Sequence, residues 1–115
     1  MLRKVCCTGY CWINRVSNFS YILAEINIAD RATYAAYEAG FMTILLAHGG
    51  TLLAVDDEPI TLEGQQPPHR RVILRFDSEQ AARDWYLSDA YQALMQHRVQ
   101  ASEGVVTLLQ GQPLT

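Results

Sequence analysis

The sequence predicts one α+β domain in which two strand–helix–strand units share a four-stranded antiparallel sheet. Three observations support this prediction: residues 21–111 follow the order strand, helix, strand, strand, helix, strand, the strand segments alternate apolar and polar residues, and capping residues stand where helices should begin. A chain of 115 residues, half of them hydrophobic, is long enough for a single core. We expect residues 1–20 to be a flexible N-terminal extension, 21–111 the domain, and 112–115 a tail.

The first strand is expected at residues 21–28 because the residues there are β-prone, and their alternation gives the strand one apolar face and one mixed face. Its two faces would carry, respectively, Ile22, Ala24, Ile26 and Ile28, and Tyr21, Leu23, Glu25 and Asn27. Asp30 then has the right place for an N-cap, since a carboxylate accepts hydrogen bonds from the free amides of a first helical turn. The helix that follows has an apolar face at helical spacing, made of Tyr34, Tyr37, Phe41, Ile44 and Leu45. Gly49 and Gly50 should end it.

The middle of the chain predicts two strands and a polar loop. Residues 51–55 form the second strand, 56–59 turn or kink it, and 60–63 resume it as a short extension. Residues 64–69 form a loop, and 70–76 form the third strand. One face of the third strand is wholly apolar, with Val72, Leu74 and Phe76.

The second helical region begins at Ser78, which is expected to act as an N-cap. Its buried stripe consists of Ala81, Ala82, Trp85 and Tyr86. Ser88 and Asp89 indicate a break and a fresh cap, and residues 105–109 form the last strand.

Right-handed crossovers place both helical regions on one face of the sheet, with the first and third strands as central neighbours. The opposite face mixes apolar residues such as Leu23 and Ile73 with charged ones, among which Glu25 and Arg75 are expected to pair. A sheet face with this much apolar content is expected to be buried by another surface. A second copy of the chain is the simplest candidate for that surface. The expected partner is therefore the chain itself, as a homodimer through the open sheet face.

Charge and cysteine content exclude several classes of partner. Residues 1–20 carry three basic residues and no acid, whereas the rest carry six basic and twelve acidic residues, a net charge of −6, so nucleic acid is not expected as a partner. No apolar run reaches the length of a membrane span, and no membrane partner is expected. Cys6, Cys7 and Cys11 all precede the domain, which indicates a reducing compartment and a cytoplasmic protein. They lack a fourth ligand for zinc, and no metal site is expected.

Five short segments occur in their expected elements: YILAEI at 21–26, AHGG at 47–50, LEG at 62–64, RVILRF at 71–76, and ARDWYLS at 82–88, the last followed by Tyr91 and Gln92. Together they resemble the small bacterial family catalogued as domain of unknown function 1330. The resemblance implies a ferredoxin-like βαββαβ protomer that dimerises into an α+β barrel. That superfamily includes small monooxygenases, isomerases and haem-handling enzymes, so the fold does not select a function. The family usually has Ser-Pro where this chain has Ser88-Asp89, and a softer helix break is expected here.

His48 and Glu63 are the candidate catalytic residues. His48 stands near a helix C-terminus, where the helix dipole favours a protonated imidazole, and a histidine beside an apolar pocket can act as general acid or base. Glu63 would orient it, or pair with Arg71, in a cleft. The alternatives are a histidine that caps the helix and a solvated acid at a strand edge.

The candidate ligand-binding residues are Tyr37, Arg71, Trp85 and Tyr91. The aromatic ones, with Tyr34 and Tyr86, suit a flat or apolar ligand between helices and sheet, although such a stripe is more often only core. Arg71 belongs to the basic run 69–71, which would attract an anion or simply be solvated.

Two functions remain open. The first is a cofactor-independent enzyme that acts on a small organic molecule with His48 as general acid or base. The second is a non-catalytic dimeric module that binds a small ligand or only itself. They differ in geometry, because the enzyme requires His48 and Glu63 to converge on an enclosed cavity. No cofactor is expected, since no dedicated haem or flavin motif is present.

Overall fold

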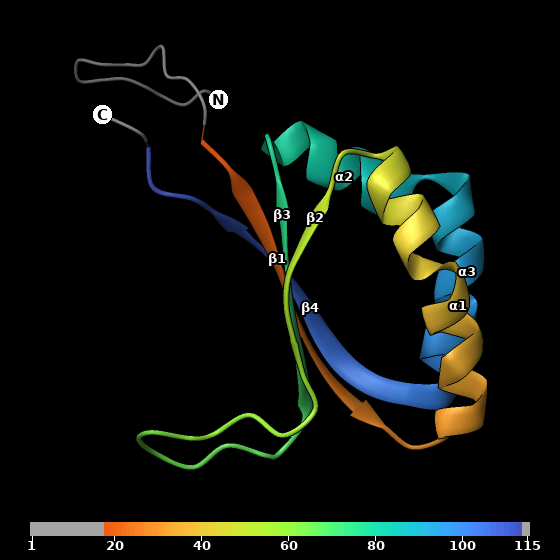
Figure 1. Cartoon of the computed structure of the whole chain (residues 1–115), viewed down its shortest axis with the longest axis vertical. Coiled ribbons are helices and arrows are strands. Elements are labelled where there is room, and N and C mark those ends of the chain that lie inside the picture. Colours follow the sequence, from red (N-terminus) through yellow and green to blue (C-terminus); the bar gives the residue numbers. More distant parts are fainter. Residues whose placement is uncertain (1–17, 114–115) are drawn as a thin grey trace.

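The computed structural model describes residues 18–113, which form a four-stranded antiparallel sheet with three helices on one face (Figure 1). The elements in chain order are β1 (Ser20–Ile28), α1 (Arg31–Ala47), β2 (Thr51–Asp56), β3 (Arg70–Phe76), α2 (Glu79–Leu87), α3 (Asp89–Ala101) and β4 (Ser102–Gln110). The strand order is β2-β3-β1-β4, so β1 and β3 are the central neighbours. The predicted α+β class and ferredoxin-like order are confirmed.

Local capping chemistry sets the helix boundaries. The carboxylate of Asp30 accepts a hydrogen bond from the Thr33 amide at 3.2 Å, and the hydroxyl of Ser78 accepts one from the Ala81 amide at 3.0 Å. Each such cap contributes about 1 kcal/mol to helix stability. At the end of α1, Gly49 has a φ of 75°, the left-handed conformation that glycine adopts without steric cost. The predicted start and end of α1 are therefore confirmed.

The break between α2 and α3 is sharp. Ser88 is extended, with φ −62° and ψ 147°, and its hydroxyl accepts a hydrogen bond from the Tyr91 amide at 3.1 Å. One residue thus ends α2 and caps α3, because its hydroxyl accepts from the first turn of α3 while its extended backbone stops α2. The softer break expected from the Asp89 substitution is wrong.

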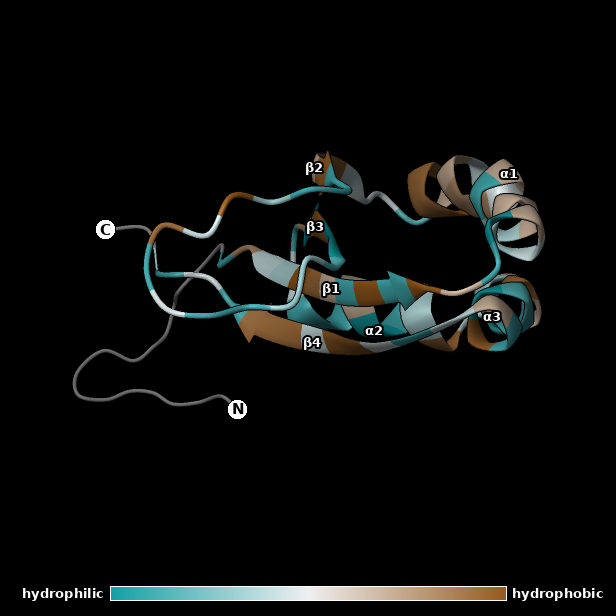
Figure 2. Ribbon diagram, turned by 90° about the horizontal axis from the view of Figure 1, so that it is seen from below, coloured by the Kyte–Doolittle hydropathy of each residue, from teal (hydrophilic) through white to brown (hydrophobic). Residues whose placement is uncertain are grey.

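The β2–β3 connection differs from the prediction. Residues 57–69 carry no strand, so the predicted extension at 60–63 is wrong. Pro59 lacks an amide for a ladder, and Ile60 and Leu62 are 85% and 95% exposed, so neither packs against the other described residues to any extent. The connection projects from the sheet on the side opposite to the helices (Figures 1 and 2).

The core lies between the sheet and the helices. The predicted inward faces of β1 and β3 are confirmed, since Ile22, Ile26, Leu74 and Phe76 are at most 4% exposed. Apolar residues, brown in Figure 2, recur along these strands and the helices. The core also holds Trp85, whose ring lies 4.2 Å from that of Tyr91 between ring centroids. Such close aromatic contacts hold α2 and α3 together.

The opposite sheet face carries a different ion pair from the expected one. Register places Glu25 opposite Arg71, and the two side chains approach to 3.3 Å. Arg75 instead lies opposite Tyr21, with its guanidinium 4.6 Å from the centre of the Phe19 ring. The predicted Glu25–Arg75 pair is wrong, because the alternation of a strand determines the face of a residue but not its partner across the ladder.

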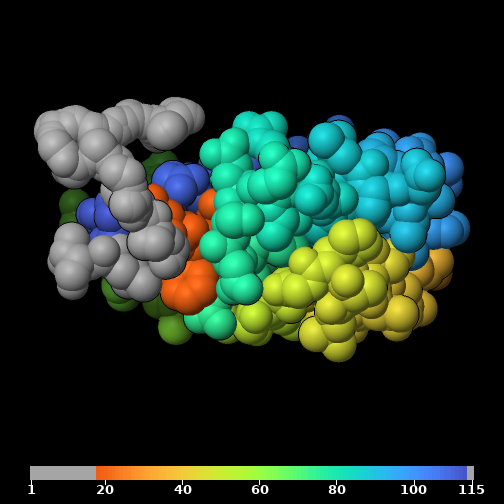
Figure 3. All heavy atoms as spheres, turned by 90° about the horizontal axis from the view of Figure 1, so that it is seen from above, coloured from red at the N-terminus to blue at the C-terminus, as the bar shows by residue number. Residues whose placement is uncertain are grey.

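The helices cover one side of the molecule closely. In the space-filling view the atoms of α2 and α3, teal to blue, meet those at the end of α1, yellow, without a gap (Figure 3). Residues 1–17 of the expected extension 1–20, with the three cysteines, lie outside the described residues, and β1 begins at Ser20, one residue before the predicted domain. None of the helices among the described residues has the length and apolar character to cross a membrane.

Candidate functional site

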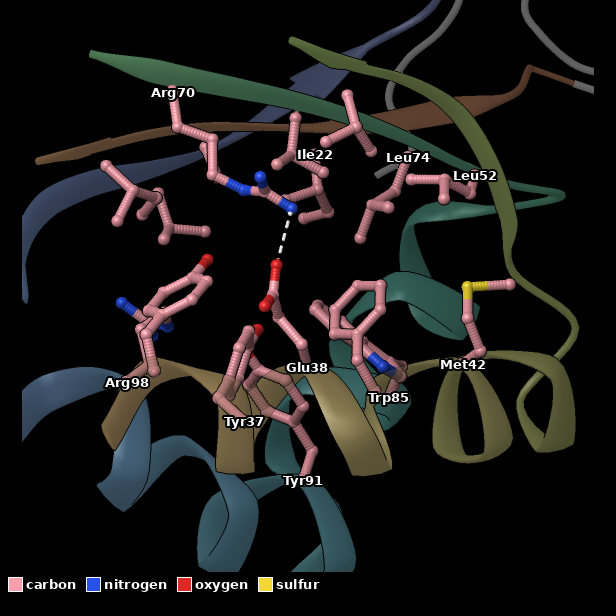
Figure 4. A pocket seen from close by; sticks show the side chains of 17 residues that line it. Ile22, Tyr37, Glu38, Met42, Leu52, Arg70, Leu74, Trp85, Tyr91 and Arg98 are labelled. Carbon is pink, nitrogen blue, oxygen red and sulfur yellow. Dashed lines mark hydrogen bonds and ion pairs between the residues drawn. The ribbon is translucent and has the colours of Figure 1, made fainter. Parts of the chain in front are cut away.

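A cavity of about 160 Å³ lies between α1 and the sheet. It exists because α1 packs mainly against α3 and stands away from the strands (Figure 1). Every helix and strand contributes at least one side chain to its wall, so its shape depends on the whole fold. Figure 4 shows side chains from the sheet and from the helices pointing toward one another across this space.

The wall is mostly apolar, and its mouth lies between α1 and β2. Met42 of α1 is 39% exposed, and Leu52 and Val55 of β2 are 36% and 43% exposed, although all three line the cavity. These side chains form the part of the cavity wall that is partly exposed to solvent. The wall opposite is formed by buried residues such as Ile22 and Tyr91, which are at most 4% exposed.

Two tyrosine hydroxyls meet inside the cavity. The hydroxyl oxygens of Tyr37 and Tyr91 lie 2.7 Å apart and share a hydrogen bond, which joins α1 to α3. Burial raises the pKa of Tyr37 well above its ordinary value, and the neighbouring Tyr91 hydroxyl raises it further. Tyr37 therefore stays protonated near neutral pH and acts as a hydrogen-bond group rather than as a base. Since the pair has two protons and one mutual bond, one O–H remains to donate elsewhere.

A buried arginine lies next to this tyrosine pair. Arg98, in the last turn of α3, is only 8% exposed, and its guanidinium carbon lies 5.7 Å from the centre of the Tyr37 ring. Its Nε is buried and has no hydrogen-bond partner among the described residues. Burial acts to lower the pKa of Arg98, but the hydroxyls of Tyr91 and Tyr37 outweigh this effect and the pKa is raised. The side chain therefore remains a cation inside the fold.

The other charged residues of the cavity belong to a chain of ion pairs. Arg70 of β3 reaches across the cavity to Glu38 of α1 at 3.1 Å (Figure 4) and also binds Asp57 at 2.9 Å. Asp57 in turn binds Arg31 at 3.0 Å. The hydrogen bond from Arg70 is the main cause that holds the pKa of Asp57 below its usual value, and with the hydrogen bond from Arg31 and the two positive charges it outweighs the opposing effect of burial. The two arginines, Arg70 and Arg31, and the two carboxylates of Glu38 and Asp57 therefore neutralise one another.

Trp85 supplies a further buried donor. It is 1% exposed and lines the cavity, and its indole Nε1 has no hydrogen-bond partner among residues 18–113. The Nε of Arg70 is also buried without a hydrogen-bond partner among the described residues. Buried polar atoms in folded proteins are rarely left without a partner, so three such donors around one cavity require an explanation.

The structure brings together Tyr37, Trp85 and Tyr91 of the predicted site, all of which line the cavity. It shows no hydrogen bond or ion pair between His48 and Glu63 among the described residues: His48 directly follows α1, and Glu63 lies beyond the far end of β2. His48 caps α1, and its ring Nδ1 donates to the Ile44 carbonyl at 2.9 Å.

The remaining two predicted site residues also lie away from the cavity. Glu63 is exposed in the projecting connection. Arg71 lies on the open sheet face, where it binds Glu25 and the loop carbonyls of His69 and Pro67. No hydrogen bond or ion pair joins Glu63 to Arg71 or to His48 among the described residues. The pairing of Glu63 with either residue stays a prediction.

Arg98 and Glu38 are cavity residues that are absent from the predicted site. Arg98 follows Tyr91 by seven residues, two helical turns, and therefore lies on the same face of α3. Glu38 directly follows Tyr37 in α1. The seven-residue spacing of Tyr91 and Arg98 indicates that they share a face of α3. The local sequence does not show that this face is buried. The part of the chain that the structure describes contains no cluster of three or more histidine, cysteine, aspartate or glutamate residues arranged to hold a metal ion.

Comparison with known proteins relates the chain to a family and to a group of folds. The model of the family described as Domain of unknown function (DUF1330) matches residues 19–112. A protein of unknown function from Rhodopseudomonas palustris has a similar structure, with a TM-score of 0.66, 20% sequence identity, and coverage of 89% of this chain and 87% of that one. No curated protein sequence shows significant similarity to the chain.

Two further solved structures carry named activities. SnoaB from Streptomyces nogalater, a cofactor-independent oxygenase, has a TM-score of 0.57 at 9% identity, over 84% of this chain and 95% of that one. A proposed antibiotic biosynthesis monooxygenase from Caulobacter crescentus has a TM-score of 0.56 at 13% identity, over 88% and 94%. At such identities the likeness shows the fold, which is ferredoxin-like, and no more.

Proposed function

The chain belongs to the family described as Domain of unknown function (DUF1330), and we propose that it binds a small organic molecule in the cavity between α1 and the sheet. The observation that carries this proposal is the cavity itself, which is mostly apolar and has a few polar side chains turned into it. Ligand sites generally combine such walls with a small number of placed polar groups. A cavity kept only by imperfect packing would be dry and apolar instead.

The size of the cavity limits the ligand. An engineered cavity of roughly 150 Å³ in another protein holds one benzene molecule, and the cavity here measures about 160 Å³. It therefore fits a single ring with a small substituent, or an aliphatic molecule of similar bulk. The mouth beside Met42 and Val55 allows part of a longer substituent to remain outside.

We place binding ahead of catalysis. The enzyme hypothesis requires His48 and Glu63 to converge on the cavity, and neither lines it. The fold neighbours include proteins named as oxygenases, so a cofactor-independent reaction in this cavity is the second candidate. In that case the cavity residues, rather than His48, would surround the substrate. The catalytic roles of His48 and Glu63 stay predictions.

We further propose that two copies associate through the open sheet face. Register places Val105 and Leu109 of β4 on that face, where they are 59% and 44% exposed, beside the half-buried Leu23 and Ile73. The projecting connection carries the exposed Ile60 and Leu62 on the same side of the sheet. Apolar surface of this extent is typical of an interaction site, and an apolar arm beside it suits contact with a second copy.

Binding is tested by NMR with a reporter inside the cavity. The chain has two tryptophans, and Trp12→Phe leaves Trp85 as the only indole. Its Nε1–H signal should shift in a saturable manner when a single-ring compound enters, because this atom lies in the wall. Val55→Phe, at the mouth, should weaken binding, whereas the same change at Val99, which is 54% exposed on α3 and outside the cavity, should not.

The test uses a panel of neutral, anionic and cationic single-ring compounds. If no member shifts the Trp85 signal at millimolar concentration, the proposed function is wrong. If compounds bind but Val99→Phe weakens binding as much as Val55→Phe does, the site lies elsewhere.

A further inference from the structure

We propose that the ligand is a small carboxylic acid whose anionic group is bound by Arg98 and the hydroxyl pair of Tyr37 and Tyr91. This inference rests on the proposed function, since it names the class of molecule that the cavity binds. It is carried by the charge, the hydrogen-bonding capacity and the layout of the cavity wall.

The charge of the cavity is positive once its internal pairs are counted. Its charged residues are Glu38, Arg70 and Arg98, and Glu38 and Arg70 neutralise each other at 3.1 Å. This leaves a charge of +1 at Arg98. No side-chain carboxylate among residues 18–113 lies within 4.0 Å of Arg98, and the segments outside that range contain no aspartate or glutamate. A buried cation whose neighbours are neutral hydroxyls, with no carboxylate among the described residues, is costly, so an anion that enters would be bound strongly.

Hydrogen-bonding capacity points in the same direction. The buried groups of this wall that have no hydrogen-bond partner within residues 18–113 are all donors: the Nε atoms of Arg98 and Arg70 and the Nε1 of Trp85. The Tyr37–Tyr91 pair adds one O–H. The one carboxylate in the wall, Glu38, is already bound to Arg70. A ligand rich in acceptors completes such a site, whereas an amine or another cation finds no free anionic partner.

The layout separates a polar end from an apolar one. In Figure 4, Arg98 lies at one end of the cavity and Met42 at the other, with Tyr37 and Trp85 between them. Since Met42 is at the mouth, the guanidinium lies at the inner end. A ligand would therefore point its charged group inward and leave its apolar body among the aliphatic side chains of the sheet. A carboxylate fits this end because guanidinium groups bind carboxylates through paired, charge-assisted hydrogen bonds.

The experiment compares benzoate with benzamide, which has nearly the same shape but no charge. Titrations of the full chain by calorimetry, near pH 7, should show benzoate binding at least about tenfold tighter than benzamide, as expected for one charge-assisted interaction. Arg98→Met should reduce benzoate affinity to that of benzamide and change benzamide affinity less than twofold. Arg83→Met, on the exposed surface of α2, serves as the matched control and should change neither affinity.

The outcomes separate this inference from the proposed function. If both compounds bind equally well, or if Arg98→Met leaves the preference for benzoate intact, the carboxylate assignment is overturned while the binding function stands. If neither compound nor any other member of the panel binds, the proposed function itself is wrong. The wild-type comparison decides the question even if the Arg98 variant does not fold.

Discussion

The arginine that we assign to ligand binding should lower the stability of the empty protein, and Arg98→Met tests this directly. Methionine keeps most of the apolar length of the side chain while removing its charge and its unsatisfied Nε. If the fold retains Arg98 for a ligand rather than for itself, the methionine variant should be more stable than the wild type when no ligand is present.

The expected change in the free energy of unfolding follows from one stabilising contribution and two destabilising ones. Removing a buried donor that has no partner should stabilise the protein by about 1–3 kcal/mol. Against this, the change removes the interaction of the guanidinium with the Tyr37 ring at 5.7 Å, worth about 0.5–1 kcal/mol. It also removes a cation from the last turn of α3, worth about 0.3–1 kcal/mol. At the middle of these ranges the net expectation is a gain of about 0.6 kcal/mol, or about 2–5 °C in the melting temperature of a domain of this size.

Urea unfolding followed by circular dichroism, with thermal melts in parallel, measures this change. The matched control is Arg83→Met, in which an exposed arginine loses its ion pair with Glu79 at 2.7 Å and stability falls by no more than about 0.5 kcal/mol. If Arg98→Met loses more than 1 kcal/mol relative to wild type, Arg98 is satisfied within the fold. The reasoning that it awaits an anion would then be refuted.

The open sheet face provides another test: Ile73→Glu should give a monomer in analytical ultracentrifugation where the wild type is a dimer, because it places a charge among the apolar residues of that face. Tyr37→Phe and Tyr91→Phe should each lower the free energy of unfolding by about 1–2 kcal/mol, and the double variant by less than the sum, since one hydroxyl alone loses its buried partner. The pKa of Asp57 is lowered in the folded state, so its stabilising contribution is present above the unfolded pKa of about 3.9 and is lost as the pH falls through the folded value. On acidification below about pH 5, the Asp57→Asn variant should therefore lose less stability than the wild type does. The difference should be less than about 1 kcal/mol. Benzoate affinity should stay constant between about pH 6 and 9, because the raised pKa of Tyr37 keeps that hydroxyl protonated and the cavity wall contains no histidine.

Each of these expectations has an opposite result. A dimer that survives Ile73→Glu would place the interface elsewhere. Additive effects of the two tyrosine substitutions would show that the hydroxyls are not coupled. An Asp57→Asn variant with an unchanged acid transition would mean that the ion pairs of Asp57 add nothing measurable. A fall in benzoate affinity between pH 7 and 9 would indicate a titrating group at the site.

Local pattern was sufficient for the order of the elements. The alternation in β1 and β3 and the caps at Asp30, Ser78 and Ser88 predicted strands, helices and breaks, because these features depend on residues close in the chain. The same pattern predicted that Tyr37, Trp85 and Tyr91 face the sheet, since helical spacing determines which side chains share a face.

Where the sequence analysis was wrong, the result depended on segments distant in the chain. The partner of Glu25 is Arg71 because the register of β1 against β3 is set by the whole ladder. Glu63 was expected on a strand extension, but the connection that carries it leaves the sheet, and the local sequence does not determine the direction of a long connection.

The sequence alone determined the α+β class, the caps and the apolar faces, because periodicity and capping are properties of neighbouring residues. Only the tertiary structure decided that α1 stands away from the sheet, that Arg70 pairs with Glu38 across the resulting cavity, and that Arg98 is buried there without a carboxylate. The physical reason is that burial and charge pairing depend on distances between elements, and these distances arise only when all seven elements pack together.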